Sequence, residues 1–392
     1  MAIRSTYLRS PRQTAFRRIA FQVHLWMGLG LGLYMLVMSL TGVALLFEDE
    51  IAAAMDPQLY HVHDAGGPHV DMDTLVQSVH ARYPKNKIWR IYSPTTRRDT
   101  YLVSLEETGG FRTVFAHPAT GAILGELPRE GFMPFVWDVH ANLVSGNVGR
   151  RVTCTLGLAA LVLFATGLLV WWPGITRWWH ALGVNTHENW QVVTRRLHGA
   201  VGIWTFVFLV MFATTGALYY YGPPFYRALA LVSVRTDHPV AWSDPGLEGK
   251  SARPNLAQLI AEANARSPDK TLWALFPPMG PNAPIQVVLA PIGDDLGRHA
   301  WDWDATGHRY VYFDQYSGRL LVQWDLANRT AADFVRSWVV PLHRGSFDGF
   351  GIKLLWACIG LAPALLFVLG AVMWWSRVLR PRVTKRTVSN GA

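Results

Sequence analysis

The chain has 392 residues, of which 51% are hydrophobic and only 16% are charged, whereas an ordinary soluble domain has about 25% charged residues. This composition argues against a plain cytosolic enzyme, and the 18 Trp residues favour contact with lipid, because Trp collects where membrane meets water. The formal net charge is +9, but the basic residues are not gathered into one patch, so no nucleic acid partner is expected. Cys154 and Cys358 are too few for a disulfide scaffold, an iron–sulfur cluster or a Cys-rich zinc site, and we expect both to be small core residues. Any metal must rely mainly on His.

Four apolar runs are long enough to cross about 30 Å of hydrocarbon, which takes roughly 20 helical residues. They predict membrane-spanning helices at 21–47, 152–172, 197–221 and 352–375. The first run is longer than the apolar part of a secretory signal and has no small-residue cleavage site before Glu48. We therefore expect it to stay in the mature protein as an uncleaved anchor.

The distribution of basic residues predicts the orientation. Segments 1–20, 173–196 and 376–392 together hold 13 basic residues and 1 acidic residue, so they belong in the cytoplasm by the positive-inside rule. The long connections 48–151 and 222–351 then lie outside, which in a bacterial inner membrane is the periplasm. The expected protein is a multi-pass inner-membrane protein with both termini cytoplasmic.

Each long connection has the pattern of a small α+β module. Asp71–Tyr83 and Pro254–Ser267 have helical spacing of apolar residues, and strand-like runs follow both. The segments 114–124 and 311–321 read as pairs of strands joined by a turn that contains Gly. The predicted fold is thus a bundle of four transmembrane α-helices with two outside α+β modules.

The chain is also an internal duplication. An offset of 174 places His24 on His198, Gly28 on Gly202 and Thr41-Gly42 on Thr215-Gly216 without a gap. An offset of 203 places the second predicted span on the fourth, and the residues that coincide are His140 with His343, Gly146 with Gly349, Gly157 with Gly360, Gly167 with Gly370 and Trp171-Trp172 with Trp374-Trp375. A duplicated unit of span, outside module and span explains both offsets.

The four matched histidines are the candidate site. His24 and His198 lie at the cytoplasmic ends of their spans, and His140 and His343 lie just before spans that enter from outside. Pairs of neutral imidazoles from facing helices bind haem iron, so we predict two b-type haems, with an inner pair His24/His198 and an outer pair His140/His343. Covalent attachment is not expected, since no Cys-x-x-Cys-His occurs. The alternative is that each His is a hydrogen-bonded interfacial residue; the other ten His, including His61, His63, His180, His187 and His238, are taken as solvated surface.

Other residues near these positions have two interpretations. Gly28, Gly32 and Gly202 would either admit a porphyrin edge or allow close helix packing. Arg side chains near the matched His could hold haem propionates, although positive-inside and snorkelling roles explain the cytoplasmic ones equally well; they are Arg17, Arg18, Arg195, Arg196, Arg151 and Arg344. Axial ligation by Met35, Met38 or Met211 is disfavoured, because Met is usual in apolar spans.

The absent motifs limit the mechanism. The sequence has no Gly-x-Gly-x-x-Gly before a helix, no Walker loop and no cytoplasmic segment longer than about 25 residues. No nicotinamide, flavin or ATP domain is therefore expected, and electrons must come from a separate donor, either a membrane quinol or a cytosolic reductase.

Six motifs resemble the PepSY-associated transmembrane proteins of bacterial iron uptake, in particular inner-membrane ferrisiderophore reductases of the FoxB type. They begin at His24 (HLWMGL), Thr41 (TGV), His140 (HANLVSG), Thr166 (TGLLVWWP), Arg196 (RLHGAVG) and Leu342 (LHRGSFDGFG). The resemblance covers essentially the whole chain and implies PepSY-like outside modules. It also implies reduction of a ferric siderophore in the periplasm with two bound haems, whose ligands map onto the four His.

Two other functions are weighed against this one. A PepSY-type regulatory or partner-binding membrane protein would need no haem. A siderophore permease is disfavoured, because four spans filled by two haems leave little room for a pathway. The substrate cleft of a reductase could be lined by outside aromatic residues, which are equally suited to the cores of the modules; these are Trp137, Trp301, Trp303, Tyr310, Tyr312, Trp324 and Trp338.

Overall fold

A computed structural model describes residues 15–63, 67–95, 98–108, 110–128, 130–174, 178–179, 182–183, 186–232, 241–250, 253–292, 308–325, 331–346 and 349–379. Trp301, Trp303, His180 and His238 lie outside the described residues, as do most of the basic residues of both tails. The chain forms two compact units, each described by itself below. The helical unit comprises 1–46, 135–225 and 342–392, and the sheet unit comprises 47–134 and 226–341.

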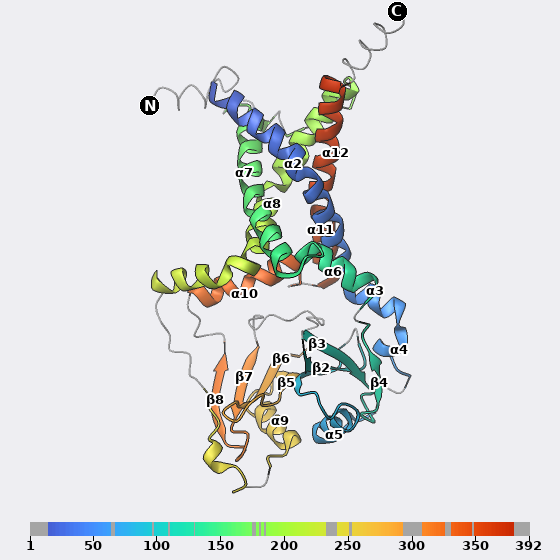
Figure 1. Cartoon of the computed structure of the whole chain (residues 1–392), viewed down its shortest axis with the longest axis vertical. Helices are drawn as coiled ribbons and strands as arrows, with labels where there is room; N and C mark the ends of the chain where they lie inside the picture. Colours follow the sequence, from blue (N-terminus) through green and yellow to red (C-terminus); the bar gives the residue numbers. More distant parts are fainter. Residues whose placement is uncertain are drawn as a thin grey trace, which may run out of the picture. The chain divides into compact units, whose positions relative to one another are not determined.

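The helical unit contains four helices that are long and apolar enough to span a membrane (Figure 1). They are α2 (Ala15–Leu46), α7 (Gly146–Trp171), α8 (Trp190–Val232) and the pair α11 (Gly349–Gly360) and α12 (Ala362–Trp374), which continues as a short π-helix over Trp375–Leu379. Every backbone polar group inside a bilayer must be paired within the protein, and a helix meets that requirement with its own hydrogen bonds. The protein is thus a multi-pass membrane protein with four candidate spans, which confirms the expected fold class.

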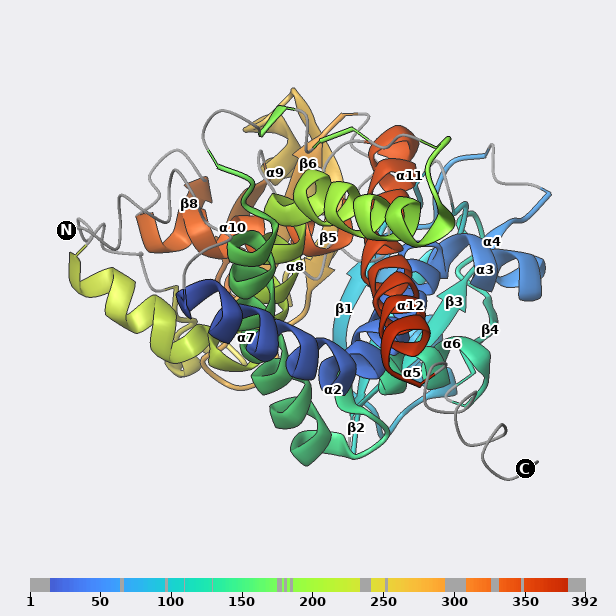
Figure 2. The same cartoon turned by 90° about the horizontal axis from the view of Figure 1, so that it is seen from above.

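Helix α2 lies between α7 and α12 (Figures 1 and 2). The duplication is visible in these contacts. Ser39 of α2 donates its hydroxyl hydrogen bond to the Gly360 carbonyl, and a Cβ built on Gly157 of α7 would lie 3.4 Å from the carbonyl oxygen of Ala213 in α8. Ala213 is the equivalent of Ser39 and Gly157 is the equivalent of Gly360, so this contact between two spans recurs in both halves.

The glycines that follow His24 and His198 lie at helix contacts. A Cβ on Gly32 would overlap the Phe367 ring of α12. On Gly28 it would meet a Leu163 methyl group at 3.8 Å, and on Gly202 it would meet Leu366 at 3.7 Å. Close helix packing is therefore shown at Gly32, whereas a methyl group would fit at Gly28 and Gly202. Admission of a porphyrin edge stays a prediction.

Two shorter helices, α6 (Phe132–Asn142) and α10 (Ala331–Arg344), precede the second and fourth spans. Leu143 and Val144, between α6 and α7, both have positive φ values of 48° and 53°. A β-branched residue in this left-handed region is strained, and such strain persists only where the surrounding structure holds it. The turn thus directly follows the helix that carries His140.

The sheet unit is built on one antiparallel sheet of eight strands in the order β4-β3-β2-β1-β5-β6-β7-β8. The strands are β1 (Ile88–Tyr92), β2 (Tyr101–Glu107), β3 (Gly110–Ala116), β4 (Ile123–Glu126), β5 (Lys270–Phe276), β6 (Ile285–Pro291), β7 (Arg309–Phe313) and β8 (Leu320–Asp325). The two modules meet where β1 pairs with β5, with Ile91 opposite Leu275. The expected α+β pattern of each module is confirmed, but the sequence did not predict that the modules share one sheet.

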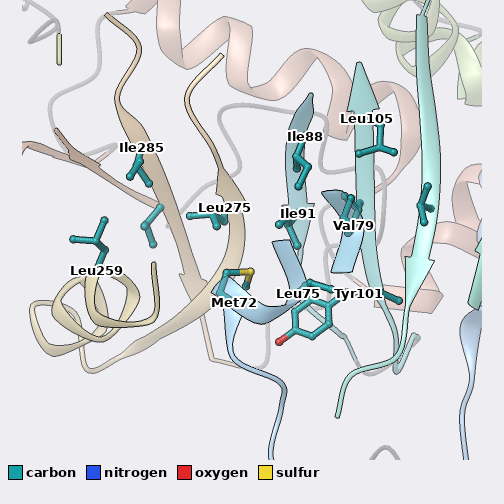
Figure 3. Packing of buried hydrophobic residues seen from close by; sticks show 14 of the residues in the cluster. Met72, Leu75, Val79, Ile88, Ile91, Tyr101, Leu105, Leu259, Leu275 and Ile285 are labelled. Carbon is teal, nitrogen blue, oxygen red and sulfur yellow. The ribbon is translucent and has the colours of Figure 1, made fainter. Parts of the chain in front are cut away.

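Helices cover both faces of this sheet. The helices are α3 (Glu48–Met55), α4 (Pro57–Tyr60), α5 (Met72–Arg82) and α9 (Leu256–Ala265), with a 3₁₀ turn at Pro245–Leu247. On one face, Leu75 and Val79 of α5 and Leu259 of α9 pack on Ile91 and Leu275 (Figure 3). On the other face, Leu59 and Tyr60 of α4 pack on a second set of buried strand residues, among them Tyr92, Leu102 and Phe115. Strand side chains alternate between the two faces of a sheet. Because both faces are buried here, the strands have nearly continuous runs of apolar residues.

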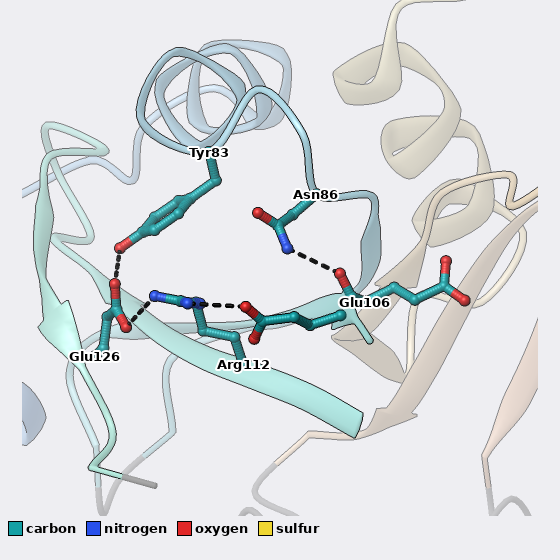
Figure 4. Close-up of polar contacts among 6 residues, drawn as sticks. Tyr83, Asn86, Glu106, Arg112 and Glu126 are labelled. Atoms are coloured by element: carbon teal, nitrogen blue, oxygen red, sulfur yellow. Dashed lines mark hydrogen bonds and ion pairs between the residues drawn. The ribbon is translucent and has the colours of Figure 1, made fainter. Parts of the chain in front are cut away.

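Polar contacts hold the edges of the sheet unit. Asp73 of α5 accepts hydrogen bonds from the backbone N–H groups of Leu256 (2.9 Å) and Ala257 (3.3 Å), so one module caps the first turn of α9 in the other. At β4, Glu126 accepts hydrogen bonds from the Tyr83 hydroxyl (2.7 Å) and from Arg112 (2.6 Å) (Figure 4). These contacts fix α5 to the neighbouring helix and to the outer strands.

Candidate functional site

The inner pair of matched histidines lies between two spanning helices. His24 is on α2 and His198 is on α8. Their ring centroids are 6.3 Å apart and their planes cross at 81°. The structure thus brings together two residues that are 174 positions apart and that the repeat predicted to be equivalent.

The outer pair lies on the two shorter helices. His140 is near the end of α6, His343 is near the end of α10, and their ring centroids are also 6.3 Å apart, with planes at 58°. Each pair therefore has the same centroid separation, although the helices that carry the two pairs differ.

This separation suits a metal ion placed between two imidazoles. A metal–imidazole bond is about 2 Å long, as for zinc, and a ring nitrogen lies roughly 1 Å from its own ring centroid, so two axial rings have centroids about 6 Å apart. Within the described parts of the chain, no three His, Cys, Asp or Glu side chains gather into a metal site. Each pair can supply two imidazole ligands, so a metal held there would need its remaining ligands from outside the pair.

Each imidazole rests against a glycine of a spanning helix. A Cβ would lie 2.9 Å from Cε1 of His24 if built on Gly167, and 3.6 Å from Cε1 of His198 if built on Gly370. For the outer pair, the corresponding distances are 3.0 Å from Gly42 to His140 and 3.2 Å from Gly216 to His343. These four glycines form two of the glycine pairs that coincide in the repeat, and at Gly167, Gly42 and Gly216 the absent side chain leaves space that the ring occupies.

Three of these glycines follow a threonine that faces the same ring. The Thr41 Oγ1 lies 2.9 Å from Nδ1 of His140, and the Thr215 Oγ1 lies 2.9 Å from Nδ1 of His343. In the inner pair, the Thr166 Oγ1 lies 3.4 Å from Nδ1 of His24. We call each of these arrangements a Thr-Gly cradle: Thr41-Gly42, Thr166-Gly167 and Thr215-Gly216.

The inner pair departs from this symmetry at one place. Nδ1 of His24 lies 3.1 Å from the Leu163 carbonyl. The repeat places Leu366 and Leu369 at the positions of Leu163 and Thr166. The buried Nδ1 of His198 finds no hydrogen-bond partner among the described residues. His198 is therefore the one ligand candidate without a Thr-Gly cradle.

The protonation of the His24 ring follows from these contacts. A carbonyl oxygen only accepts hydrogen bonds, so Nδ1 of His24 carries the proton that it shares with Leu163. A neutral imidazole with a protonated Nδ1 has its lone pair on Nε2, and this is the nitrogen it offers to a metal. In metal sites, the ligating His almost always donates its other ring N–H to a carbonyl or a similar acceptor.

Comparison with known proteins gives the family. The model of the PepSY-associated TM region matches residues 21–377, which includes all four spans and both modules. The chain belongs to the PepSY-associated TM family. This PepSY-associated TM protein is also 26% identical over 259 residues to a Pseudomonas aeruginosa protein described as "Uncharacterized protein PA4219". The match covers 61% of the chain and 62% of that protein, which is less than two thirds of its length.

The arginines near the histidines have mixed roles in the PepSY-associated TM protein. Arg17 donates a hydrogen bond to the Val170 carbonyl at 2.6 Å, and Arg196 forms an ion pair with Glu188 at 2.7 Å. Arg151, in the first turns of α7, lies over the Tyr220 ring, 5.6 Å from its centroid. Arg17, Arg196 and Arg151 thus each make a contact within the protein, and their binding of haem propionates stays a prediction.

Two expectations about single residues are wrong. His308 is 2% exposed and packs on Trp273, with ring centroids 4.9 Å apart, so it is not solvated surface; its position in the first residues before β7 places it in the core. Cys358 is exposed on the outside of α11, whereas Cys154 is buried as expected. The outer surface of a spanning helix faces lipid, which accommodates a thiol as easily as a core does.

Four of the aromatic residues considered for a substrate cleft are placed by their packing or exposure. Tyr310 is 4% exposed and its ring contacts Trp324, with centroids 5.2 Å apart, so both belong to the sheet. Trp137 is 42% exposed on α6, and Trp338 packs on Phe334 of α10. The sheet residues Tyr310 and Trp324 thus fit the core interpretation.

Proposed function

We propose that this protein carries electrons across the bacterial inner membrane on two b-type haems and reduces Fe(III)-siderophore in the periplasm, which releases Fe(II). The observation that carries the proposal is the geometry of the histidines. Each pair joins two histidines that are equivalent by the internal duplication. Both pairs have the same centroid separation of 6.3 Å, and glycines make room for a ring edge in both pairs.

The residues present fit haem. His24 and His198 would hold the inner group, and His140 and His343 would hold the outer group, each through Nε2. The surrounding helices are apolar, which suits the flat apolar body of a porphyrin. Bound haem supplies reversible one-electron transfer; the protein supplies the ligands, their orientation and a low-dielectric surrounding.

The two pairs are separated along the spans. On α2, His24 and the Thr41-Gly42 cradle of His140 are 17 to 18 residues apart, which is about 26 Å of helix at 1.5 Å per residue. This is close to the hydrocarbon thickness of about 30 Å. With the orientation given by the basic residues, one pair lies near the cytoplasmic face and the other near the periplasmic face.

The expected direction is from inside to outside. A membrane quinol or a cytosolic reductase delivers electrons near His24 and His198, and Fe(III) accepts them beyond His140 and His343. Reduction gives Fe(II), which the oxygen-rich ligands of a siderophore hold less tightly than Fe(III). This reaction needs no acid, base or nucleophile from the protein.

The test is anaerobic. Purified protein is reduced with dithionite, freed of excess reductant and mixed with a panel of ferric siderophores, while haem oxidation and capture of Fe(II) by ferrozine are followed. We expect one Fe(II) for each electron lost by the protein. Oxidation by none of the siderophores, or oxidation without Fe(II), would remove the siderophore from the proposal and leave a haem electron carrier with another acceptor.

A further inference from the structure

We infer that Thr41 and Thr215 are positioning residues that fix the protonation and the rotation of the outer histidines. Each hydroxyl keeps the proton of its imidazole on Nδ1 and so directs a bare Nε2 away from the spanning helix. The inference rests on the proposed function only for the identity of the bound metal group.

The direction of the hydrogen bonds carries the argument. The Thr41 hydroxyl donates to the Val37 carbonyl, with 2.6 Å between the oxygens. A hydroxyl has one proton, and two oxygens this close would repel each other without a proton between them. Thr41 must therefore accept from His140, and the proton of that bond, 2.9 Å long, belongs to Nδ1.

The second half of the protein repeats this arrangement. The Thr215 hydroxyl donates to the Met211 carbonyl at 2.7 Å and accepts from Nδ1 of His343 at 2.9 Å. Both outer imidazoles are thus held as Nδ1–H forms by equivalent residues.

The simpler explanation is that these threonines only bond to their own helices. Thr often donates to the carbonyl four residues earlier, and Thr205 of α8 does so with Val201 at 2.7 Å. Thr205 is thus a matched control: its hydroxyl has the same backbone contact, with no His contact recorded for it. A role confined to the helix predicts equal effects of Thr205→Val and Thr215→Val.

The first test needs no haem. Nitrogen-15 spectra of His-labelled protein, prepared without haem in detergent, distinguish a protonated ring nitrogen from a bare one. His140→Gln and His343→Gln variants assign the signals. We expect Nδ1–H forms for both outer rings, and a mixture of forms in Thr41→Val for His140 alone. Nε2–H forms in the wild-type protein would overturn the inference, whatever the protein binds.

The second test uses protein purified with haem. Removing a partner of a metal-ligating His costs about 10–100-fold in metal affinity, so Thr41→Val and Thr215→Val should each release haem to apomyoglobin faster by up to about that factor. The electron paramagnetic resonance signal of one haem should also change, because it reports ligand rotation. Thr41→Ser should restore both, since it keeps the hydroxyl, and Thr205→Val should change neither.

The outcomes separate the inference from the proposed function. Protein that has the Nδ1–H forms but never binds haem supports the inference and removes the haem. Haem-loaded Thr41→Val and Thr215→Val proteins that match Thr205→Val in release rate and resonance signal would refute the inference and leave the haem in place.

Discussion

Gly167 and Gly370 occupy equivalent places in the repeat but leave different room for a side chain. A Cβ on Gly167 would lie 2.9 Å from Cε1 and 3.3 Å from Nδ1 of His24, where relaxed carbon contacts are about 3.5–4.0 Å. On Gly370 the nearest atom is Cε1 of His198 at 3.6 Å, an ordinary contact. Gly167→Ala must therefore displace the imidazole, and Gly370→Ala need not.

The expected energies have opposite signs. Forcing a methyl group into a packed site costs about 1–3 kcal/mol, whereas replacing Gly by Ala inside a helix stabilises it by about 1 kcal/mol. The two effects together make Gly167→Ala destabilising by up to about 2 kcal/mol. For Gly370→Ala only the helix term remains, so this variant should be neutral or more stable by up to about 1 kcal/mol.

The assay compares the two variants in the same detergent. Thermal unfolding of protein without haem gives the stability difference, and release of haem to apomyoglobin reports the inner pair. We expect Gly167→Ala to unfold at lower temperature and to release one haem faster, while Gly370→Ala behaves like the wild type or better. Equal behaviour of the two variants would show that His24 does not rest on Gly167.

Three further predictions address the inner ligand and the sheet unit. His24→Ala should lose one haem and block reduction of the other by a cytoplasmic-side donor, while an outside reductant still reduces it; two unchanged haem spectra would contradict the assignment. Asp73→Ala should lower the stability of the sheet unit by about 0.5–2 kcal/mol, as for loss of a helix cap, and should increase hydrogen exchange at the start of α9 more than in α5; unchanged exchange in α9 would exclude the cap between modules. Burial raises the pKa of Glu126, but the hydrogen bonds from Tyr83 and Arg112 lower it further, so its pKa in the folded protein is below the ordinary value. The stabilising effect of Glu126 is therefore present above the ordinary Glu pKa of about 4.3 and is lost as the pH falls through the folded value. At pH 7 we expect faster hydrogen exchange of β4 in Glu126→Gln than in the wild type, and the two exchange rates should approach each other near the acid end of this range. A difference in exchange that does not depend on pH would rule out this role.

The sequence predicted the elements of the fold better than their association. The long apolar runs predicted four spans, because length and hydropathy alone decide whether a helix can cross a bilayer. The pattern at Asp71–Tyr83 predicted α5 within one residue at each end. The pairing of β1 with β5 joins Ile91 to Leu275 across 184 positions, and nothing local in either strand marks its partner, because any apolar strand edge can accept another.

For the candidate site as well, the sequence predicted the residues better than the contacts between them. The repeat identified all four histidines and the glycines behind them, because both halves keep the same spacing. It did not reveal that Thr166 and Leu163 contact His24, because these residues come from a different helix and because Leu369, the counterpart of Thr166, lacks a hydroxyl. The available signal was the Thr-Gly pair, which within the four predicted spans occurs at Thr41, Thr166 and Thr215 and which the structure places there against three imidazoles.

The haem content of the purified protein, measured together with its ligation, tests the proposal most directly. Protein from haem-replete cells should contain about two haems per chain by pyridine haemochrome and give the absorption and resonance signals of haem with two His ligands. His198→Ala and His343→Ala should each remove one haem, and His308→Ala, which alters a buried His of the sheet unit, should remove none. A stable, colourless wild-type preparation would contradict the haem sites and favour a PepSY-type protein that binds an envelope partner without redox chemistry.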